Sequence, residues 1–218
     1  GFPTTADLVY LWDGTLWNQL GPDIEGEAPG DDSGWSVTLS SDGSTVAIGA
    51  PSNSSNSWRH GHVRVFNYNS VNNDWEKIGQ DLDGDDISDE CGSSVAISQD
   101  GQKVAIGIPG DDEFNGDNGS VRVFENISGN WVQIGSDIFG VNQADNLGYS
   151  ISLSTDGNIL AIGAPSSDIT YPLEGYARVY MNINGNWTQL GQDINGSFLN
   201  EAFGYDVSLS GDGSILAI

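Results

Sequence analysis

Apolar and polar residues alternate over short stretches of this chain, and the same alternation returns at a regular spacing. In residues 36–40, Val37 and Leu39 alternate with polar side chains. This period of two predicts a β-strand with one face more deeply buried than the other. The next stretch, residues 46–49, is apolar or small at every position, which predicts a strand covered on both faces.

This pattern recurs as a repeat in which each copy contains four predicted strands. An Asp-Gly pair separates the first two strands in every copy, and a tight hairpin needs residues that tolerate positive φ. A tryptophan in the fourth strand precedes the next opening glycine by 17 residues. The opening glycines are Gly34, Gly92, Gly148 and Gly204, the Asp-Gly pairs begin at Asp42, Asp100, Asp156 and Asp212, and the tryptophans are Trp17, Trp75, Trp131 and Trp187.

Packing of these units against one another sets the expected fold. A single four-stranded meander buries too little apolar surface to be stable, so the units must stack face to face. The radial form of such stacking is an all-β β-propeller of four-stranded antiparallel blades, with about four repeats of 56–58 residues. We expect one domain over residues 1–218, comprising strands three and four of one blade over 8–24, repeats over 34–82, 92–138 and 148–194, and strands one and two of a closing blade over 204–218.

The two ends of this pattern leave two architectures open. The partial blades at residues 8–24 and 204–218 are complementary, and together they would complete a fourth blade without an open sheet edge. A chain cut from a longer array would also give complementary ends in some phases. The sequence is therefore consistent with a closed four-bladed ring and with part of a larger propeller or array.

Several short motifs recur at fixed places in the repeats. They include Gly49-Ala50-Pro51, Gly163-Ala164-Pro165 and Phe203-Gly204. These Gly-Ala-Pro and Phe-Gly elements resemble the FG-GAP repeats of integrin α-subunit propellers and of related surface proteins. The resemblance implies a propeller and an extracellular setting. The family's calcium loop, Asp-x-Asp-x-Asp-Gly, is replaced here by short turns such as residues 41–44, so its calcium sites do not carry over.

Composition excludes some partners. Six Lys and Arg stand against 31 Asp and Glu, which gives a net charge of −25 that repels nucleic acid and anionic membrane surfaces. No apolar run is long enough to insert in a membrane. The acidity fits either solubility in a salty, calcium-containing medium or a cation site. Cys91 is the only cysteine, which excludes an intramolecular disulfide and predicts a small buried side chain.

Most acidic residues fall in the long loops, which a meander places at one end of the blades. The best metal candidate is the set Asp111, Glu113, Asn115 and Asp117, where oxygens at alternate positions surround a turn glycine as calcium loops require. The alternative is a solvated acidic turn. Calcium is therefore the cofactor that the sequence favours.

Other recurring polar residues are predicted to be structural. The repeated Asp23, Asp81, Asp137 and Asp193 are expected to cap backbone amides in turns, and the repeated Arg64, Arg122 and Arg178 to pair with carboxylates between blades. His60 and His62 suggest a two-histidine zinc site, for which the sequence reveals no third ligand.

No nucleophile triad, phosphate-binding loop or zinc cysteine pair is recognisable, so the chain is predicted not to be an enzyme. We expect a secreted or cell-surface module that binds an extracellular protein, a glycan or copies of itself through its acidic loop face. The alternatives are a carbohydrate-binding propeller and, less favoured, a glycan hydrolase with paired carboxylates, for which Glu113, Asp145 and Glu201 are the divergent acids. The candidate binding-face residues are Trp35, Trp58, Asp85, Asp86, Tyr149 and Tyr205, and the candidate glycosylation sites are Asn53, Asn118, Asn126, Asn186 and Asn195.

Overall fold

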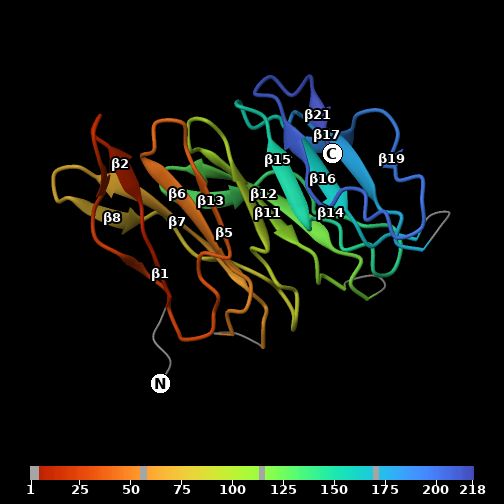
Figure 1. Ribbon diagram of the computed structural model, residues 1–218, viewed down its shortest axis with the longest axis horizontal. Coiled ribbons are helices and arrows are strands. Elements are labelled where there is room, and N and C mark those ends of the chain that lie inside the picture. Colours follow the sequence, from red (N-terminus) through yellow and green to blue (C-terminus); the bar gives the residue numbers. More distant parts are fainter. Residues whose placement is uncertain (1–4, 55–57, 113–115, 169–171) are drawn as a thin grey trace.

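A computed structural model describes residues 5–54, 58–112, 116–168 and 172–218 of the chain. Every regular element in these ranges is a β-strand, and consecutive strands form antiparallel blades that lie side by side in an arc (Figure 1). The described residues include no helix long and apolar enough to cross a membrane. The all-β propeller fold predicted from the repeat is confirmed.

Three blades are complete and share one topology. In each, four strands follow one another in sequence order, and a short fifth strand pairs with the start of the third. The first contains β5 (Ser36–Leu39), β6 (Thr45–Ala50), β7 (His62–Asn69), β8 (Asp74–Lys77) and β9 (Leu82–Asp83). The second contains β10 (Ser94–Ile97), β11 (Lys103–Ile108), β12 (Ser120–Ile127), β13 (Asn130–Gln133) and β14 (Ile138–Phe139), and the third contains β15 (Ser150–Leu153), β16 (Ile159–Ala164), β17 (Tyr176–Ile183), β18 (Asn186–Gln189) and β19 (Ile194–Asn195).

Partial blades flank these three. At one end β1 (Ala6–Asp7) pairs with β4 (Ile24–Glu25), and β2 (Tyr10–Trp12) pairs with β3 (Trp17–Gln19). At the other end β20 (Ser208–Leu209) pairs with β21 (Leu216–Ala217). Within the described ranges, no strand of one partial blade pairs with a strand of the other, and they lie at opposite ends of the arc (Figure 1). The structure is an open arc of blades, which fits part of a larger propeller.

The Asp-Gly hairpins form as the sequence predicts. Gly43 has φ +71°, and the Asp42 carboxylate accepts hydrogen bonds from the Ser40 hydroxyl at 2.7 Å and the Ser44 amide at 2.9 Å. These bonds hold the pKa of Asp42 at about 2, well below its usual value, because they stabilise the ionised form. The Asp-Gly pair at residue 100 and those at 156 and 212 repeat the positive φ and the carboxylate bonds.

Two hydrogen bonds recur between neighbouring blades. The Trp131 indole donates to the Ile78 carbonyl of the preceding blade at 2.9 Å. The Ser94 hydroxyl donates to the Gly148 carbonyl of the following blade at 2.7 Å. A Cβ at Gly107 would lie 2.0 Å from that same carbonyl oxygen, so only glycine permits this approach. The fixed spacing between tryptophan and opening glycine therefore preserves the contacts that join the blades.

The apolar core follows the second strands. β6, β11 and β16 are almost entirely buried, as predicted for strands covered on both faces. Cys91 is 1% exposed within one of these core clusters, and burial raises the pKa of its thiol. The cysteine is therefore a small buried side chain in the core, as predicted.

Candidate functional site

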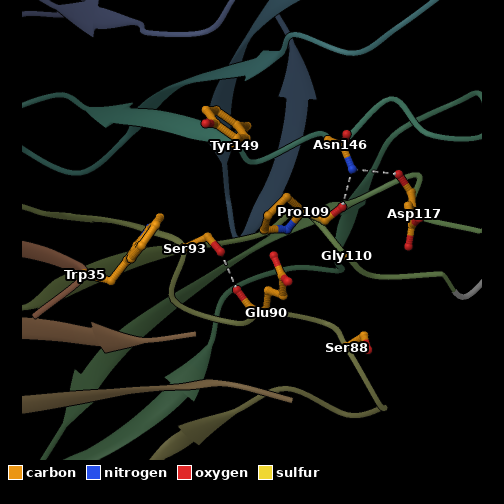
Figure 2. A pocket seen from close by; sticks show the side chains of 9 residues that line it. All are labelled: Trp35, Ser88, Glu90, Ser93, Pro109, Gly110, Asp117, Asn146 and Tyr149. Carbon is orange, nitrogen blue, oxygen red and sulfur yellow. Dashed lines mark hydrogen bonds between the residues drawn. The ribbon is translucent and has the colours of Figure 1, made fainter. Parts of the chain in front are cut away.

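A cavity of about 470 Å³ opens where the connections of three successive blades meet (Figure 2). We call it the Trp35–Tyr149 cavity. Trp35, Ser93 and Tyr149 each directly follow the opening glycine of a blade, and the strands that come next, β5, β10 and β15, are neighbours in space. The full lining is Trp35, Ser88, Glu90, Ser93, Pro109, Gly110, Asp117, Asn146 and Tyr149.

One small residue creates this space. The position after the opening glycine carries an aromatic ring in Trp35, Tyr149 and Tyr205 but the small Ser93 in the blade between the first two. One blade further on, the rings of Tyr149 and Tyr205 contact each other directly, with centroids 4.9 Å apart. Trp35 and Tyr149 therefore line a cavity because the intervening side chain is too short to reach either of them.

The loops around the cavity are fixed by backbone bonds between the connections. Glu90 and Asn146 stand at equivalent positions, with φ values of +57° and +51°. The Glu90 amide donates to the Arg59 carbonyl at 3.1 Å, and the Asn146 amide donates to the Asp117 carbonyl at 3.2 Å. The same left-handed conformation recurs at this position in every connection, so it belongs to the blade architecture.

Side-chain bonds then orient the polar groups. The Asn146 side-chain amide donates to the Pro109 carbonyl at 3.1 Å, which ties two connections together beside the cavity. Arg59 lies 2.8 Å from the Glu90 carboxylate, and the Glu90 carboxylate points toward Pro109 in Figure 2. Glu90 is therefore the carboxylate of the cavity whose position is set by a partner.

Tyr149 is a neutral phenol in this setting. Its hydroxyl donates to the Tyr205 hydroxyl at 3.0 Å, and this bond is the main cause that raises the pKa of Tyr149 to about 12. Tyr149 is 40% exposed and Trp35 is 68% exposed, and both line the cavity. Aromatic faces next to carboxylate, hydroxyl and amide groups suit a small polar ring compound.

Three of the six predicted binding-face residues lie together. Trp35 and Tyr149 line the cavity, and Tyr205 contacts Tyr149. The other three do not line the cavity: Asp85 pairs with Arg122, and Asp86 and Trp58 are exposed outside it.

The predicted calcium loop is only partly described, because Glu113 and Asn115 lie outside the described residues. Asp111 is 4% exposed, and its carboxylate accepts a hydrogen bond from the Ser120 hydroxyl at 2.7 Å, inside the blade. Asp117 instead lines the Trp35–Tyr149 cavity. Asp111 and Asp117 thus lie in different surroundings, and calcium binding at this loop stays a prediction.

Two of the predicted glycosylation sites conflict with the fold. Asn53 and Asn118 are each 1% exposed, and their side-chain amides donate to the Asp31 carboxylate at 2.9 Å and to the Gly140 carbonyl at 3.1 Å. A glycan cannot be accommodated on a buried, bonded amide, so the prediction is wrong for these two. Asn126 is partly buried, whereas Asn186 and Asn195 are exposed.

The divergent acids proposed for glycan hydrolysis have structural roles where they are described. The Asp145 carboxylate accepts hydrogen bonds from the amides of Val141 and Asn142, at 3.0 and 2.9 Å. Glu201 caps the amides of two residues in the same way one connection later. Asp145 and Glu201 therefore cap turns, while Glu113 lies outside the described residues.

The recurring aspartates do not cap backbone amides as predicted, because their carboxylates bind side chains. Arg122 donates to Asp137 at 2.8 Å, and Arg178 donates to both oxygens of Asp193 at 2.8 and 2.7 Å. Asp23 accepts from Gln19, and Asp81 pairs with Lys77. The predicted pairing between blades holds for Arg122, which also pairs with Asp85 of the preceding connection. Arg178 pairs instead with Asp193 of its own blade, and Arg64 donates to the Glu25 carbonyl.

Comparison with known proteins identifies the fold. No family model and no curated protein matches the chain. A solved structure from Bacteroides uniformis, provisionally assigned as a 6-phosphogluconolactonase, is 16% identical over 89% of this chain with a TM-score of 0.58. A Bacteroides fragilis protein with the same provisional assignment is 15% identical over 78% of this chain with a TM-score of 0.54. The chain spans 50% and 41% of the lengths of those two proteins.

These comparisons correct the function expected from the sequence. Both similar structures are described as lactonases, which are enzymes, and this contradicts the prediction of a non-enzymatic adhesion or assembly module. The Trp35–Tyr149 cavity gathers residues from three connections, so Trp35, Glu90 and Tyr149 share no local motif that the sequence could reveal. The likeness to FG-GAP repeats has no family match and shows only in the propeller fold.

Proposed function

We propose that this chain is part of a propeller hydrolase that opens the ester bond of a sugar lactone in the Trp35–Tyr149 cavity. The observation that carries this proposal is the oriented Glu90 carboxylate in a cavity with two aromatic walls. The fold shared with two provisionally assigned lactonases supports the same reaction class. The proposal concerns the reaction type and the site, which the fold alone leaves undetermined.

The dimensions and lining of the cavity suit this substrate class. A volume of about 470 Å³ lies within the range of small-molecule sites. The exposed rings of Trp35 and Tyr149 offer apolar faces for the C–H surface of a sugar ring. Ser93 and Asn146 bring polar groups to the same space for the hydroxyls of the sugar.

The chemistry requires a base that activates water. A carboxylate within hydrogen-bond reach of a bound water can accept its proton as the oxygen attacks the lactone carbonyl. The acyl carbon–ring oxygen bond then breaks, and the proton passes from the carboxylate to the released ring oxygen to give the open hydroxy acid. Glu90 takes this role in our proposal, and Arg59 holds its carboxylate in place.

Charge favours an unphosphorylated lactone. The residues that line the cavity include the acids Glu90 and Asp117, and none of these lining residues is a Lys or Arg. The chain carries a net charge of −25. A phosphate group would be repelled by this field and would find no cation in the lining. We therefore propose a neutral sugar lactone as the substrate.

Lactone opening by the purified chain tests the proposal. Glucono-δ-lactone is supplied in a weakly buffered solution, and acid release is compared with the spontaneous rate. Wild type is expected to accelerate the release, and Glu90→Gln to lower kcat by about 10²-fold or more. Asp86→Asn removes an exposed carboxylate from the same connection and serves as the matched control. Release at the spontaneous rate by wild type, or equal rates in Glu90→Gln and Asp86→Asn, would overturn the proposal.

A secreted setting and kinship with FG-GAP repeats remain parts of this proposal. The exposed amides of Asn186 and Asn195 and the strong net negative charge support a secreted setting. The Gly-Ala-Pro elements at residues 49–51 and 163–165 support the kinship. Peptide mass spectrometry after expression through a secretory pathway tests the setting, with glycans expected at these two asparagines.

A further inference from the structure

Three potential metal ligands from distant parts of the sequence meet beside the first complete blade. Glu27 follows β4, His62 begins β7, and Asp81 directly precedes β9. One ligand atom from each lies within 4.8 Å of the other two. None of the three lines the Trp35–Tyr149 cavity, so this cluster is separate from the proposed hydrolase site.

The buried imidazole of His62 has a nitrogen atom that is available to bind a metal ion. His62 is 1% exposed, and among the described residues its Nδ1 atom has no hydrogen-bond partner. This atom lies 3.9 Å from Oε2 of Glu27, too far for a hydrogen bond. A buried polar atom left unsatisfied costs about 1–3 kcal/mol, and such atoms usually have a partner in native structures.

The next blade shows how the same carboxylate pair is neutralised elsewhere. Asp85 and Asp137 occupy the repeat positions of Glu27 and Asp81, and the Arg122 guanidinium pairs with both. In the first complete blade the equivalent arginine donates instead to the Glu25 carbonyl at 2.8 Å. The carboxylates of Glu27 and Asp81 therefore converge on an imidazole nitrogen where the next blade has a guanidinium.

We propose that Glu27, His62 and Asp81 bind a divalent transition-metal ion, for which Zn²⁺ is the probe. One imidazole and two carboxylates form a ligand set that such ions accept, with water completing the shell. Calcium and magnesium prefer oxygen ligands alone, so the histidine favours a transition metal. The ion neutralises the two carboxylates, as Arg122 does for the equivalent pair in the next blade.

The geometry needs only a small adjustment to hold the ion. Bonds of about 2.0–2.2 Å in a tetrahedral shell place ligand atoms about 3.3–3.6 Å apart. The Glu27 side chain is 37% exposed, so it can rotate toward His62 without disturbing the core.

Two positively charged side chains near the cluster, Lys77 and Arg64, oppose the binding of a metal ion. Lys77 lies 2.7 Å from one oxygen of Asp81, and Arg64 stands two residues after His62 on β7, on the same face of the strand. Lys77 is 40% exposed on a flexible stem, so an ion can displace it from the carboxylate. Removing its charge in Lys77→Met is therefore expected to strengthen zinc binding.

Calorimetric titration of the chelator-treated chain with Zn²⁺, in excess Mg²⁺ to occupy weak carboxylate sites, tests the proposal. Wild type is expected to bind one equivalent, and Glu27→Gln to weaken that binding by about tenfold or more. Asp85→Asn removes the same charge at the equivalent position of the next blade and is expected to retain wild-type affinity. Equal weakening in both variants, or no binding by wild type, would overturn the site.

A second measurement identifies the histidine without relying on a buried substitution. The ring-nitrogen resonances of both histidines are followed by NMR while Zn²⁺ is added to wild type. The Nδ1 resonance of His62 is expected to shift strongly at one equivalent, whereas His60, whose Nε2 lies 3.8 Å from Asp83, should respond weakly. A larger shift at His60, or no shift at His62, would contradict the assignment.

Discussion

Trp131 joins the second blade to the first, and its replacement measures how strongly the blades depend on each other. Trp131 is 3% exposed and packs among apolar residues of both blades. Its indole donates to the Ile78 carbonyl at 2.9 Å, and the Gln80 side chain donates to its carbonyl at 2.7 Å. The residue thus combines core packing with bonds across the interface.

The structure sets the expected magnitude. Trp131→Phe keeps an aromatic ring but leaves the Ile78 carbonyl without its donor, which costs about 1–3 kcal/mol. Trp131→Ala also creates a cavity. For a side chain buried this deeply, the expected total loss of stability is about 3–5 kcal/mol. Because domains of this size are stable by only about 5–15 kcal/mol, the phenylalanine variant is the one to measure quantitatively.

Trp17 provides a matched control from the same chain. It holds the repeat position of Trp131, but it is 66% exposed because no described blade precedes it. Trp17→Phe is expected to change stability by about 0.5 kcal/mol or less. Urea unfolding followed by far-UV circular dichroism gives the midpoint and slope for each variant. Similar midpoints for the Trp131→Phe and Trp17→Phe chains would refute the claim that this contact holds the blades together.

Two further predictions follow from the same repeat geometry. Gly107→Ala places a Cβ 2.0 Å from the Gly148 carbonyl oxygen, so we expect a loss of about 1–3 kcal/mol, measured as a lower urea midpoint with folding retained. The Arg178 hydrogen bonds hold the pKa of Asp193 below its usual 3.8, so the pair stabilises the fold above that pH, and the contribution disappears as the pH falls through the lower folded value. Asp193→Asn is therefore expected to reduce the drop in urea midpoint between neutral and acid solution, and an unchanged drop would contradict this.

The blade architecture could be predicted because identical contacts recur at identical spacings. The Asp-Gly pair between the first two strands of each repeat reverses the chain, and every tryptophan in a complete blade donates to a carbonyl of the preceding blade. A repeated spacing reveals such contacts without any knowledge of their partners. Closure of the ring could not be predicted, because complementary ends occur both in rings and in arcs.

The candidate sites were only partly predictable because they depend on differences between repeats. Trp35 and Tyr149 were identified as exposed aromatics, but the cavity between them follows from the small Ser93 in the intervening blade. The sequence suggests His62 as a zinc ligand but reveals no third ligand for the ion. Glu27 lies 35 positions before His62, and the fold brings these segments together through the Arg64–Glu25 hydrogen bond and the pairing of β7 with β9.

Comparison of one position across the blades separates scaffold from chemistry. The first residue of the third strand is His62, Ser120 or Tyr176, on the same backbone and in the same register. The Ser120 hydroxyl donates to Asp111 at 2.7 Å, and the Tyr176 hydroxyl donates to Asp145 at 2.9 Å, so both side chains fasten a loop to the blade. The histidine keeps the position buried but leaves a ring nitrogen facing a carboxylate. A different side chain at one position of the repeated backbone therefore replaces a residue that fastens a loop with a metal-binding residue, and the blade itself is unchanged.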